Sequence, residues 1–197
     1  MTLSTNAGEL VFIVGENGSG KTTLLKLILG LYDPQQGEIL LNGETVGPQR
    51  RDDYRQFFSA IFFDYFLFDD LVVPNGIDAA VIRDYLQNLD IADKVSIENG
   101  HFSTTDLSTG QRKRLALIQV YLENKPILVF DEWAAEQDPT FRRVFYRQLL
   151  PDLKRQGKTL IVISDDDRYF DVADRVVRLE RGVTHENLAL DSTRQSP

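Results

Sequence analysis

The clearest chemical signature in the sequence is the glycine-rich run GENGSGKT, from Gly15 to Thr22. The apolar run 10–14 precedes it and residues 23–29, which read TLLKLIL, follow it, so we expect the run between a strand and a helix. Glycines let the chain turn so tightly that successive backbone N–H groups point at one phosphate, at the positive end of the helix. The run therefore predicts a P-loop that holds a nucleotide.

Polar side chains of this loop would contact the nucleotide and its metal ion. Lys21 would reach the β- and γ-phosphates, and the Thr22 hydroxyl would ligate the Mg²⁺ that bridges them. The alternative, a glycine-rich turn without a ligand, is disfavoured by the matching strand and helix. The nucleotide-binding residues predicted here are Gly15, Asn17, Gly18, Ser19, Gly20, Lys21, Thr22 and Thr23.

A second motif, LSTGQ at Leu107–Gln111, opens a run of helix formers that reaches Leu122. The N-terminus of that helix is another site suited to an anion. Taken alone, the motif fits an ordinary helix cap better; beside a P-loop, a nucleotide contact is favoured. The spacing of Leu115, Ile118 and Leu122 predicts one buried stripe, whereas residues 112–114, which read RKR, are expected to face water.

The third motif is an apolar run that ends in two carboxylates. Ile127–Phe130 shows no alternation, which is typical of a parallel strand covered on both faces. This strand would carry Asp131 to the carboxyl edge of a sheet, where a carboxylate can hold Mg²⁺ through water. Glu132 could then orient the water that attacks the γ-phosphate. The alternative is a pair of exposed carboxylates that close a strand.

Together these three motifs resemble the ATP-binding cassette (ABC) ATPases. In that family an LSGGQ-type signature contacts the γ-phosphate held by the P-loop of a second, head-to-tail subunit. The resemblance therefore implies nucleotide contacts for Ser108, Gly110 and Gln111, and for Asp138, which lies where the family has its D-loop at the dimer interface. It also implies ATP and Mg²⁺ as cofactors, ATP hydrolysis, and an ATP-dependent head-to-tail homodimer.

Two longer segments indicate a subgroup. Residues 131–139, DEWAAEQDP, and 166–182, DDRYFDVADRVVRLERG, resemble the cassettes of cyclic-peptide or siderophore-peptide exporters, with Trp133 where most cassettes carry proline. In those proteins a membrane domain precedes the cassette in the same polypeptide. The resemblance implies a transmembrane domain as partner, a location at the cytoplasmic face of the inner (plasma) membrane, and a peptide-like or siderophore substrate.

The sequence departs from the family at Asp165, where most cassettes have a histidine that bonds the γ-phosphate and the catalytic glutamate. A carboxylate there would face phosphate oxygens and two other acids, and like charges at that range oppose each other. We therefore expect Glu132 and Asp165 to decide turnover, with hydrolysis weak or absent while Mg-nucleotide binding is kept. The alternative is an ordinary cap for a helix that begins near Asp167.

Two further departures concern the metal ion and the adenine base. Phe63 stands where the family has a glutamine that ligates Mg²⁺, so Asp64 joins Thr22 and Asp131 as a candidate metal ligand; a loop Asp bonded to its own backbone is an equal alternative. Residues 1–9 hold no aromatic ring to stack on adenine. Either the chain is trimmed at that boundary, or adenine binds about tenfold more weakly.

Composition bounds the function classes. The 197 residues suit one α/β domain with a helical insert, and the absence of cysteine excludes disulfides and thiolate metal sites. Lys and Arg number 22 against 30 Asp and Glu, a net charge of −8 that argues against nucleic acid as a partner. No apolar run is long enough to span a bilayer, and no signal segment opens the chain.

Strands and helices alternate along much of the chain, which predicts an α/β fold with the nucleotide at the carboxyl ends of parallel strands. The resemblance specifies a P-loop NTPase cassette of the ABC type, with a mostly parallel core sheet, a short antiparallel hairpin and a helical subdomain. We expect the nucleotide-binding core in 1–72 and 126–190, the helical signature subdomain in 73–125, and a disordered tail in 191–197. The expected elements are strands 10–14, 59–63, 126–130, 158–163 and 175–180, helices 21–31, 78–89, 140–155 and one from Asp167, and a hairpin over 37–46 that turns at Asn42-Gly43.

Seven aromatic residues crowd into residues 57–68, where family cassettes dock a membrane domain. We expect most of these rings to be core, and any exposed remainder to form a binding patch. Three functions stay open: the ATPase of an exporter, a soluble cassette acting on DNA or ribosomes, and a nucleotide-binding switch without turnover. The second is disfavoured, because such cassettes usually carry a coiled-coil insertion or a second cassette.

Overall fold

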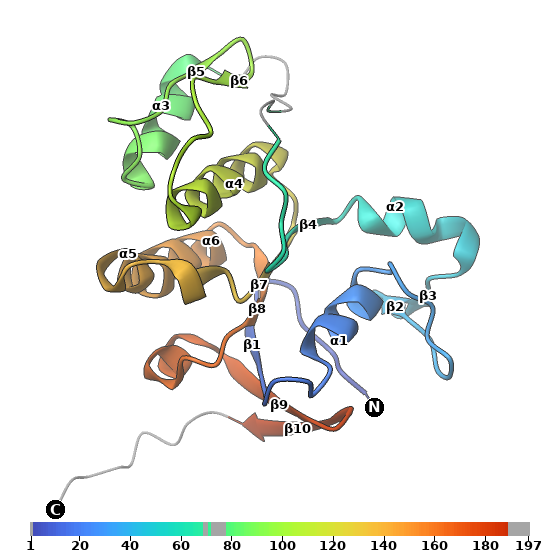
Figure 1. Cartoon of the computed structure of the whole chain (residues 1–197). Coiled ribbons are helices and arrows are strands. Elements are labelled where there is room, and N and C mark those ends of the chain that lie inside the picture. The colour runs from blue at the N-terminus through green and yellow to red at the C-terminus, as the bar shows by residue number, and fades with distance from the viewer. Residues whose placement is uncertain (1, 69–70, 72–77, 189–197) are drawn as a thin grey trace, which may run out of the picture.

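The protein is described here by a computed structural model that covers residues 2–68, 71 and 78–188. A six-stranded sheet runs through its centre in the order β10-β9-β1-β8-β7-β4 (Figure 1). All neighbouring strands are parallel except β9 and β10. The strands of this sheet are β1 (Leu10–Val14), β4 (Phe58–Ile61), β7 (Ile127–Asp131), β8 (Thr159–Ile163), β9 (Arg175–Glu180) and β10 (Val183–Leu188).

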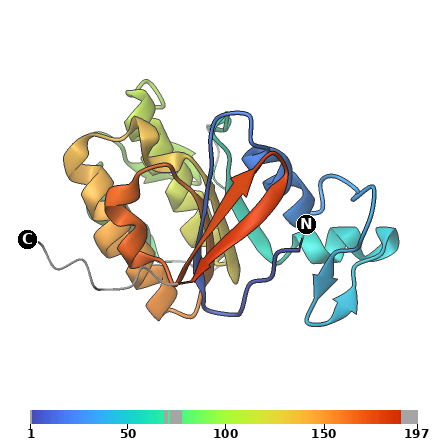
Figure 2. The ribbon, with the colours of Figure 1, turned by 90° about the horizontal axis from the view of Figure 1, so that it is seen from below.

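Helices cover both faces of the sheet, and two small hairpins lie outside it (Figure 2). The helices are α1 (Lys21–Ile28), α2 (Arg51–Arg55), α3 (Ala79–Asn88), α4 (Thr109–Glu123), α5 (Pro139–Val144) and α6 (Leu150–Arg155), with shorter turns η1 (Pro48–Arg50), η2 (Trp133–Glu136), η3 (Phe145–Leu149) and η4 (Asp167–Val172). The hairpins are β2 (Leu40–Leu41) with β3 (Glu44–Thr45), and β5 (Ile97–Glu98) with β6 (His101–Phe102).

Strand β1 shows why the core has two halves. All five of its residues are buried, and successive side chains point to opposite faces. Phe12 packs with the residues of α4, α5 and η3, whereas Ile13 packs with α1 and its neighbours. In register, Ile13 lies opposite Ile163, which lies opposite Asp131, so β1, β8 and β7 end together at one edge. This edge carries the P-loop.

The helix expected over 140–155 is a helical run with a change of winding. Asp138 caps α5, and Pro139 occupies its first position, where a missing N–H costs nothing. The segment η3 is a π-helix that ends at Leu149, two residues before Pro151, whose ring and missing N–H disrupt the α-helical hydrogen-bond ladder. The change of winding places Tyr146 against the end of β8, with its hydroxyl 2.7 Å from Ser164 Oγ.

Several expected elements differ from those observed. Strand β4 ends at Ile61 rather than at residue 63, because the chain turns there with a hydrogen bond from Tyr65 N–H to Phe62 O. Helix α2 and the edge strand β10 were not expected. Strand β10 follows a turn with positive φ at both Arg181 and Gly182, a geometry that suits a two-residue hairpin. The predicted disordered tail, 191–197, and residues 73–77 lie outside the described residues.

Two predictions about burial were wrong. Leu115, Ile118 and Leu122 are buried and Arg112 is exposed, as expected, but Lys113 is fully buried and Arg114 is 6 % exposed. Both cations point toward acidic side chains of another segment instead of water, at Glu136 and Asp138. We expected most of the seven aromatic rings of 57–68 to be core, but four of them are exposed: Phe57, Phe63, Phe66 and Phe68. None of the described helices is long and apolar enough to traverse a bilayer.

Candidate functional site

The loop between β1 and α1 is shaped by its glycines. Gly18 and Gly20 have φ of +80° and +102°, which other residues rarely adopt. A Cβ on Gly18 would meet nothing within 4 Å, whereas one on Gly15 would lie 2.3 Å from the Leu179 carbonyl oxygen of β9. Gly15 therefore lets the loop cross the end of the sheet, and no side chain caps the N-terminus of α1. The first N–H groups of α1 are left for an anion.

Lys21 is the cation at the centre of the site. It is 6 % exposed, and its Nζ donates to the Gly15 carbonyl oxygen inside the loop. The same Nζ lies 3.4 Å from Asp165 Oδ2 and 3.9 Å from Glu132 Oε1. Lysine from the helix thus meets one carboxylate from the end of β7 and one from the end of β8.

Thr22 and Asp131 form the pair that could hold a metal ion. The Thr22 hydroxyl donates to Asp131 Oδ2 at 3.2 Å, and Asp131 is 2 % exposed. Burial raises the pKa of Asp131, the Thr22 hydrogen bond and the Phe63 N–H lower it, and the charge of Asp64 raises it again. Asp64 is thus near this pair, while it is itself exposed.

Glu132 and Asp165 carry the negative charge on the other side of Lys21. Glu132 has a φ of +48°, and burial raises the pKa of its carboxyl, with the Lys21 charge opposing and the Asp165 charge adding to the rise. Asp165 is about half exposed and accepts a 3.4 Å hydrogen bond from the Gly15 N–H. The helix η4 does begin at Asp167, but Asp166 precedes it and no side chain caps it. Asp165 therefore belongs to the P-loop side of the site.

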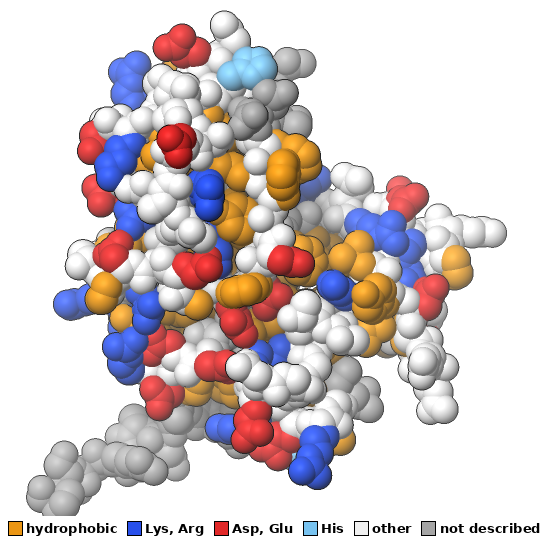
Figure 3. All heavy atoms as spheres, in the orientation of Figure 1, with side chains coloured by type: hydrophobic (Ala, Val, Ile, Leu, Met, Phe, Trp, Pro, Cys, Tyr) orange, Lys and Arg blue, Asp and Glu red, His pale blue; other side chains and the backbone are white. Residues whose placement is uncertain are grey.

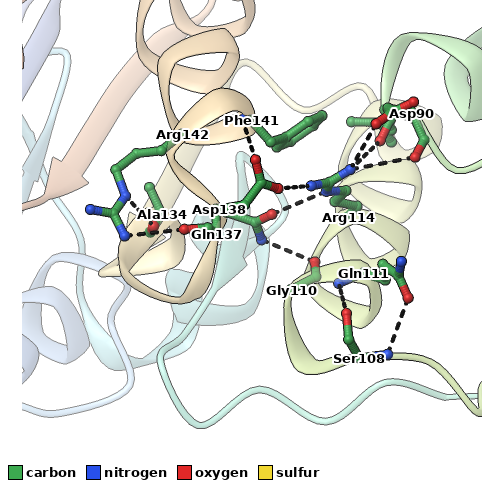
Figure 4. A network of polar contacts seen from close by, with 11 residues as sticks. Asp90, Ser108, Gly110, Gln111, Arg114, Ala134, Gln137, Asp138, Phe141 and Arg142 are labelled. Carbon is green, nitrogen blue, oxygen red and sulfur yellow. Dashed lines mark hydrogen bonds and ion pairs between the residues drawn. The ribbon is translucent and has the colours of Figure 1, made fainter.

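The signature segment begins α4 with a capping box. Ser108 Oγ accepts from the Gln111 N–H, and the Gln111 side chain accepts from the Ser108 N–H (Figure 4). Gly110 lies against η2, because its carbonyl accepts from Gln137 Nε2 at 3.0 Å and a Cβ there would lie 3.0 Å from the Glu136 carbonyl oxygen. These two backbones are therefore packed directly on each other.

Arg114 joins α4 to the segment before α5. Its guanidinium donates to Gln137 Oε1 and Asp138 Oδ2 (Figure 4). The guanidinium carbon, Cζ, lies 3.7 Å from the centre of the Phe141 ring. Asp138 also accepts from the Phe141 N–H, and this hydrogen bond leads the causes that lower the Asp138 pKa. Within this chain Asp138 thus caps α5 and pairs with Arg114.

The predicted residues fall into two groups. The P-loop, Asp131, Glu132 and Asp165 come together at the carboxyl ends of β1, β7 and β8. The second group surrounds the N-terminus of α4, and no hydrogen bond or ion pair joins the groups across the described residues. Sequence reasoning missed Arg114, because a charge beside an apolar stripe is usually solvated, and Gln137, because its side chain bonds residues more than twenty positions away along the chain. The second group comprises Ser108, Gly110, Gln111 and Asp138.

The side chains present fit Mg-nucleotide. Ser19 Oγ is buried in the loop and finds no hydrogen-bond partner in the part of the chain that the structure describes. Hydroxyl and carboxylate oxygens, as at Thr22 and Asp131, are the ligands that Mg²⁺ prefers. Over 2–68, 71 and 78–188, no cluster of three or more His, Asp or Glu side chains could hold a metal by itself. A Mg²⁺ ion here would therefore share its coordination with nucleotide oxygens and water.

Comparison with known proteins agrees with this geometry. The sequence model of the ABC transporter family matches residues 1–135. The chain belongs to the ABC transporter family. The ATP-binding protein SyrD of Pseudomonas syringae pv. syringae is 52 % identical over 186 residues, which cover 91 % of this chain and 32 % of that protein. The ATP-dependent lipid A-core flippase of Ralstonia nicotianae is 32 % identical over 199 residues, 91 % of this chain and 33 % of the flippase.

Solved structures show the same ABC fold. A bacterial Atm1-family ABC exporter with ATP bound has a TM-score of 0.75 at 26 % identity, over 91 % of this chain and 34 % of the exporter. A dimeric ATP-binding cassette in a post-hydrolysis state, bound to ADP and Pi, has a TM-score of 0.75 at 24 % identity, over 94 % of this chain and 88 % of the cassette. This ABC chain spans about a third of the length of the curated relatives it matches.

Proposed function

We propose that this ABC chain is a cassette that binds Mg-ATP and drives an exporter through a membrane-spanning partner. The observation that carries the proposal is the meeting of Lys21, Thr22, Asp131 and Glu132 at one edge of the sheet. Each is of the type that phosphoryl transfer needs at that place: a cation for phosphates, a hydroxyl and a carboxylate for the metal, and a carboxylate for water.

The residues of the site would divide the work of hydrolysis as follows. ATP supplies the phosphoanhydride bond, and Mg²⁺ neutralises charge on its phosphates. The open P-loop and the uncapped start of α1 would hold the phosphate oxygens with N–H groups, and Lys21 would turn from the Gly15 carbonyl toward them. Thr22 and Asp131 would hold the metal ion, and Glu132 would orient water for in-line attack.

Partners would complete the cassette on two sides. Ser108, Gly110 and Gln111 lie at an exposed helix start, from which they would contact the nucleotide of a second, head-to-tail copy. Phe63, Phe66 and Phe68 are 50 %, 74 % and 68 % exposed, and they would dock the membrane domain. Hydrophobic side chains gather beside the chain that runs from β4 toward α4 (Figure 3). Such docking would place the chain at the cytoplasmic face of the inner membrane.

The position of Asp165 favours slow rather than fast ATP hydrolysis. Its carboxylate lies on the P-loop, 3.4 Å from the Lys21 ammonium, so it competes with phosphate oxygens for the same cation. It also adds to the charge that Glu132 experiences. We propose that this charge slows hydrolysis while leaving Mg-ATP binding. The peptide-like or siderophore substrate is proposed on the resemblance of 131–139 and 166–182 alone.

Steady-state ATP hydrolysis of the chain and of Asp165→His, beside gel filtration with and without Mg-ATP, tests this function. We expect ATP to produce a dimer of the unchanged chain, and Asp165→His to hydrolyse ATP about tenfold faster or more, because a repulsion of about 1.4 kcal/mol at the γ-phosphate is removed. Asp167→His, an exposed change two residues away, is the matched control. Equal turnover of the chain and Asp165→His would contradict the proposal that the Asp165 charge slows hydrolysis.

A second function, a nucleotide-binding switch without turnover, is favoured by the same contact between Asp165 and Lys21. It predicts ATP-driven dimerisation with no measurable hydrolysis in the unchanged chain. Absence of any ATP binding would contradict both functions.

A further inference from the structure

Lys113 is a buried cation that the proposed reaction does not use. It is the third residue after Gly110 on α4 and is 0 % exposed. A buried ammonium is costly unless a partner compensates its charge. Within the described residues, that partner is Glu136 of η2, whose Oε2 lies 2.8 Å from Lys113 Nζ as an ion pair without hydrogen-bond geometry, and Glu136 is itself 38 % exposed.

A second segment meets the same ammonium. The centre of the Phe63 ring lies 5.0 Å from Lys113 Nζ, within the range of a cation–π contact. The Phe63 backbone N–H in turn donates to Asp131 of the metal pair. The Lys113 backbone also takes part, because its carbonyl accepts a 3.1 Å hydrogen bond from Trp133 Nε1. Lys113 thus lies where α4, η2 and the chain after β4 meet.

We propose that Lys113 is a positioning residue, which holds the start of α4, the segment 133–138 and the Phe63 turn in one arrangement around the catalytic carboxylates. The inference deepens the proposed function and rests on it for the nucleotide. Gly110 packs on the Glu136 backbone, so α4 and η2 touch directly beside the ion pair. The Lys113 charge is also among those that oppose the burial-raised pKa of Glu132.

The arrangement has a consequence for a dimer of cassettes. In such a dimer, Ser108 and Gly110, at the start of α4, would contact the nucleotide held by the second copy. Glu132 would serve the nucleotide at the P-loop of its own chain. Lys113 fixes the start of α4 to the segment 133–138. A chain without the Lys113 charge would therefore bind Mg-ATP at its own P-loop yet present Ser108 less well to a second copy.

A double-mutant cycle on unfolding by urea tests the contact itself. Lys113→Met removes the charge and leaves Glu136 free to be hydrated, so we expect a small effect. Glu136→Gln leaves the buried ammonium with a neutral partner, and the folding equilibrium constant should fall about tenfold or more. Lys113→Met/Glu136→Gln should recover most of that loss. A double variant that is no more stable than Glu136→Gln would overturn the proposal.

Two binding measurements test the positioning. Mg-ATP affinity by calorimetry should stay within about twofold in Lys113→Met, whereas the ATP-driven dimer, measured by analytical ultracentrifugation, should weaken about tenfold. Lys94→Met, a change at an exposed lysine, is the control that should match the unchanged chain in both. Dimerisation of Lys113→Met at the level of the control would overturn the proposal. A chain that binds no ATP would contradict the proposed function, while the urea cycle still decides on Lys113.

Discussion

At Gly110 the distance to a neighbouring backbone limits which side chain the position accepts. The LSTGQ motif gives this glycine an expected role toward a phosphate, and the structure adds a role in packing against Glu136. The carbonyls of Ala134 and Gln137 in that backbone accept hydrogen bonds from Arg142, so the segment has little freedom to move away. One residue type thus serves the fold and the proposed ligand together.

Gly110→Ala should destabilise the chain by about 1 kcal/mol. Overpacking against a fixed carbonyl costs about 1–3 kcal/mol, and the gain in helix propensity offsets about 0.5–1 kcal/mol of this. Gly47→Ala is the matched control, because a Cβ there meets nothing within 4 Å and its φ is −74°. Urea unfolding would measure both; an unchanged midpoint for Gly110→Ala would show that the segment yields.

Residue types predicted which side chains meet at the P-loop better than they predicted the contacts at the start of α4. Lys21, Thr22 and Asp131 could be placed because a loop between a strand and a helix, and the end of a buried strand, fix where side chains go. Lys113 and Arg114 could not, because their burial depends on Glu136 and Asp138, which lie more than twenty positions away along the chain. A local pattern carries no information about such a pairing.

Among the elements, the π-helix η3 connects the helical layer to the site. It places the Tyr146 ring 5.9 Å from that of Phe12 and stacks it on Tyr169 at 4.4 Å. The Tyr146 hydroxyl meets Ser164 Oγ, which also accepts from the Asp166 N–H. The turn that carries Asp165 between them is therefore held from the helical side.

Tyr146→Phe should change how stability depends on alkaline pH. Burial raises the pKa of Tyr146 to about 12 from 10.0, with the Ser164 hydrogen bond opposing. The folded state thus prefers the neutral phenol, and this stability is present below pH 10 and lost as the pH rises from 10 to 12. The loss amounts to roughly 2–3 kcal/mol, and the variant should lack it.

Urea unfolding at several pH values between 7 and 12 would measure this difference. Near pH 7 the variant should be about 1 kcal/mol less stable, because one buried hydrogen bond is removed. Exposed Tyr32→Phe is the control. The same alkaline slope for the chain and for Tyr146→Phe would contradict the expected change.

The sequence was less informative about short or edge elements than about the buried strands. Strands β1, β7 and β8 are apolar runs that could be located within a residue or so. Among the described strands, β10 pairs with β9 alone, and its first residues read VTHE, so its pairing rather than its hydrophobicity defines it. The π-helix likewise could not be predicted from Pro151 alone, because the effect of a proline on helix winding depends on the helix around it.

For the whole molecule, the proposed head-to-tail dimer would divide each nucleotide site between two chains. Ser108→Arg should therefore leave Mg-ATP affinity within about twofold and abolish the ATP-driven dimer, because a large cation would stand at the expected contact. It also removes the helix cap, at about 1 kcal/mol.

Calorimetry and analytical ultracentrifugation would separate the two effects of Ser108→Arg. Gln36→Arg, on an exposed loop, controls for the added charge. An ATP-driven dimer that persists in Ser108→Arg would exclude the head-to-tail arrangement. Loss of ATP binding together with the dimer would instead indicate a folding defect.

Trp133 gives this chain a built-in optical reporter. It is the single tryptophan of the sequence, 1 % exposed, and it immediately follows Glu132. Its indole lies 4.4 Å from the Phe145 ring, so tryptophan emission arises from one shielded place beside the site. Unfolding can thus be followed in unlabelled protein at one wavelength, and we expect the proposed nucleotide binding and dimerisation to change the same emission.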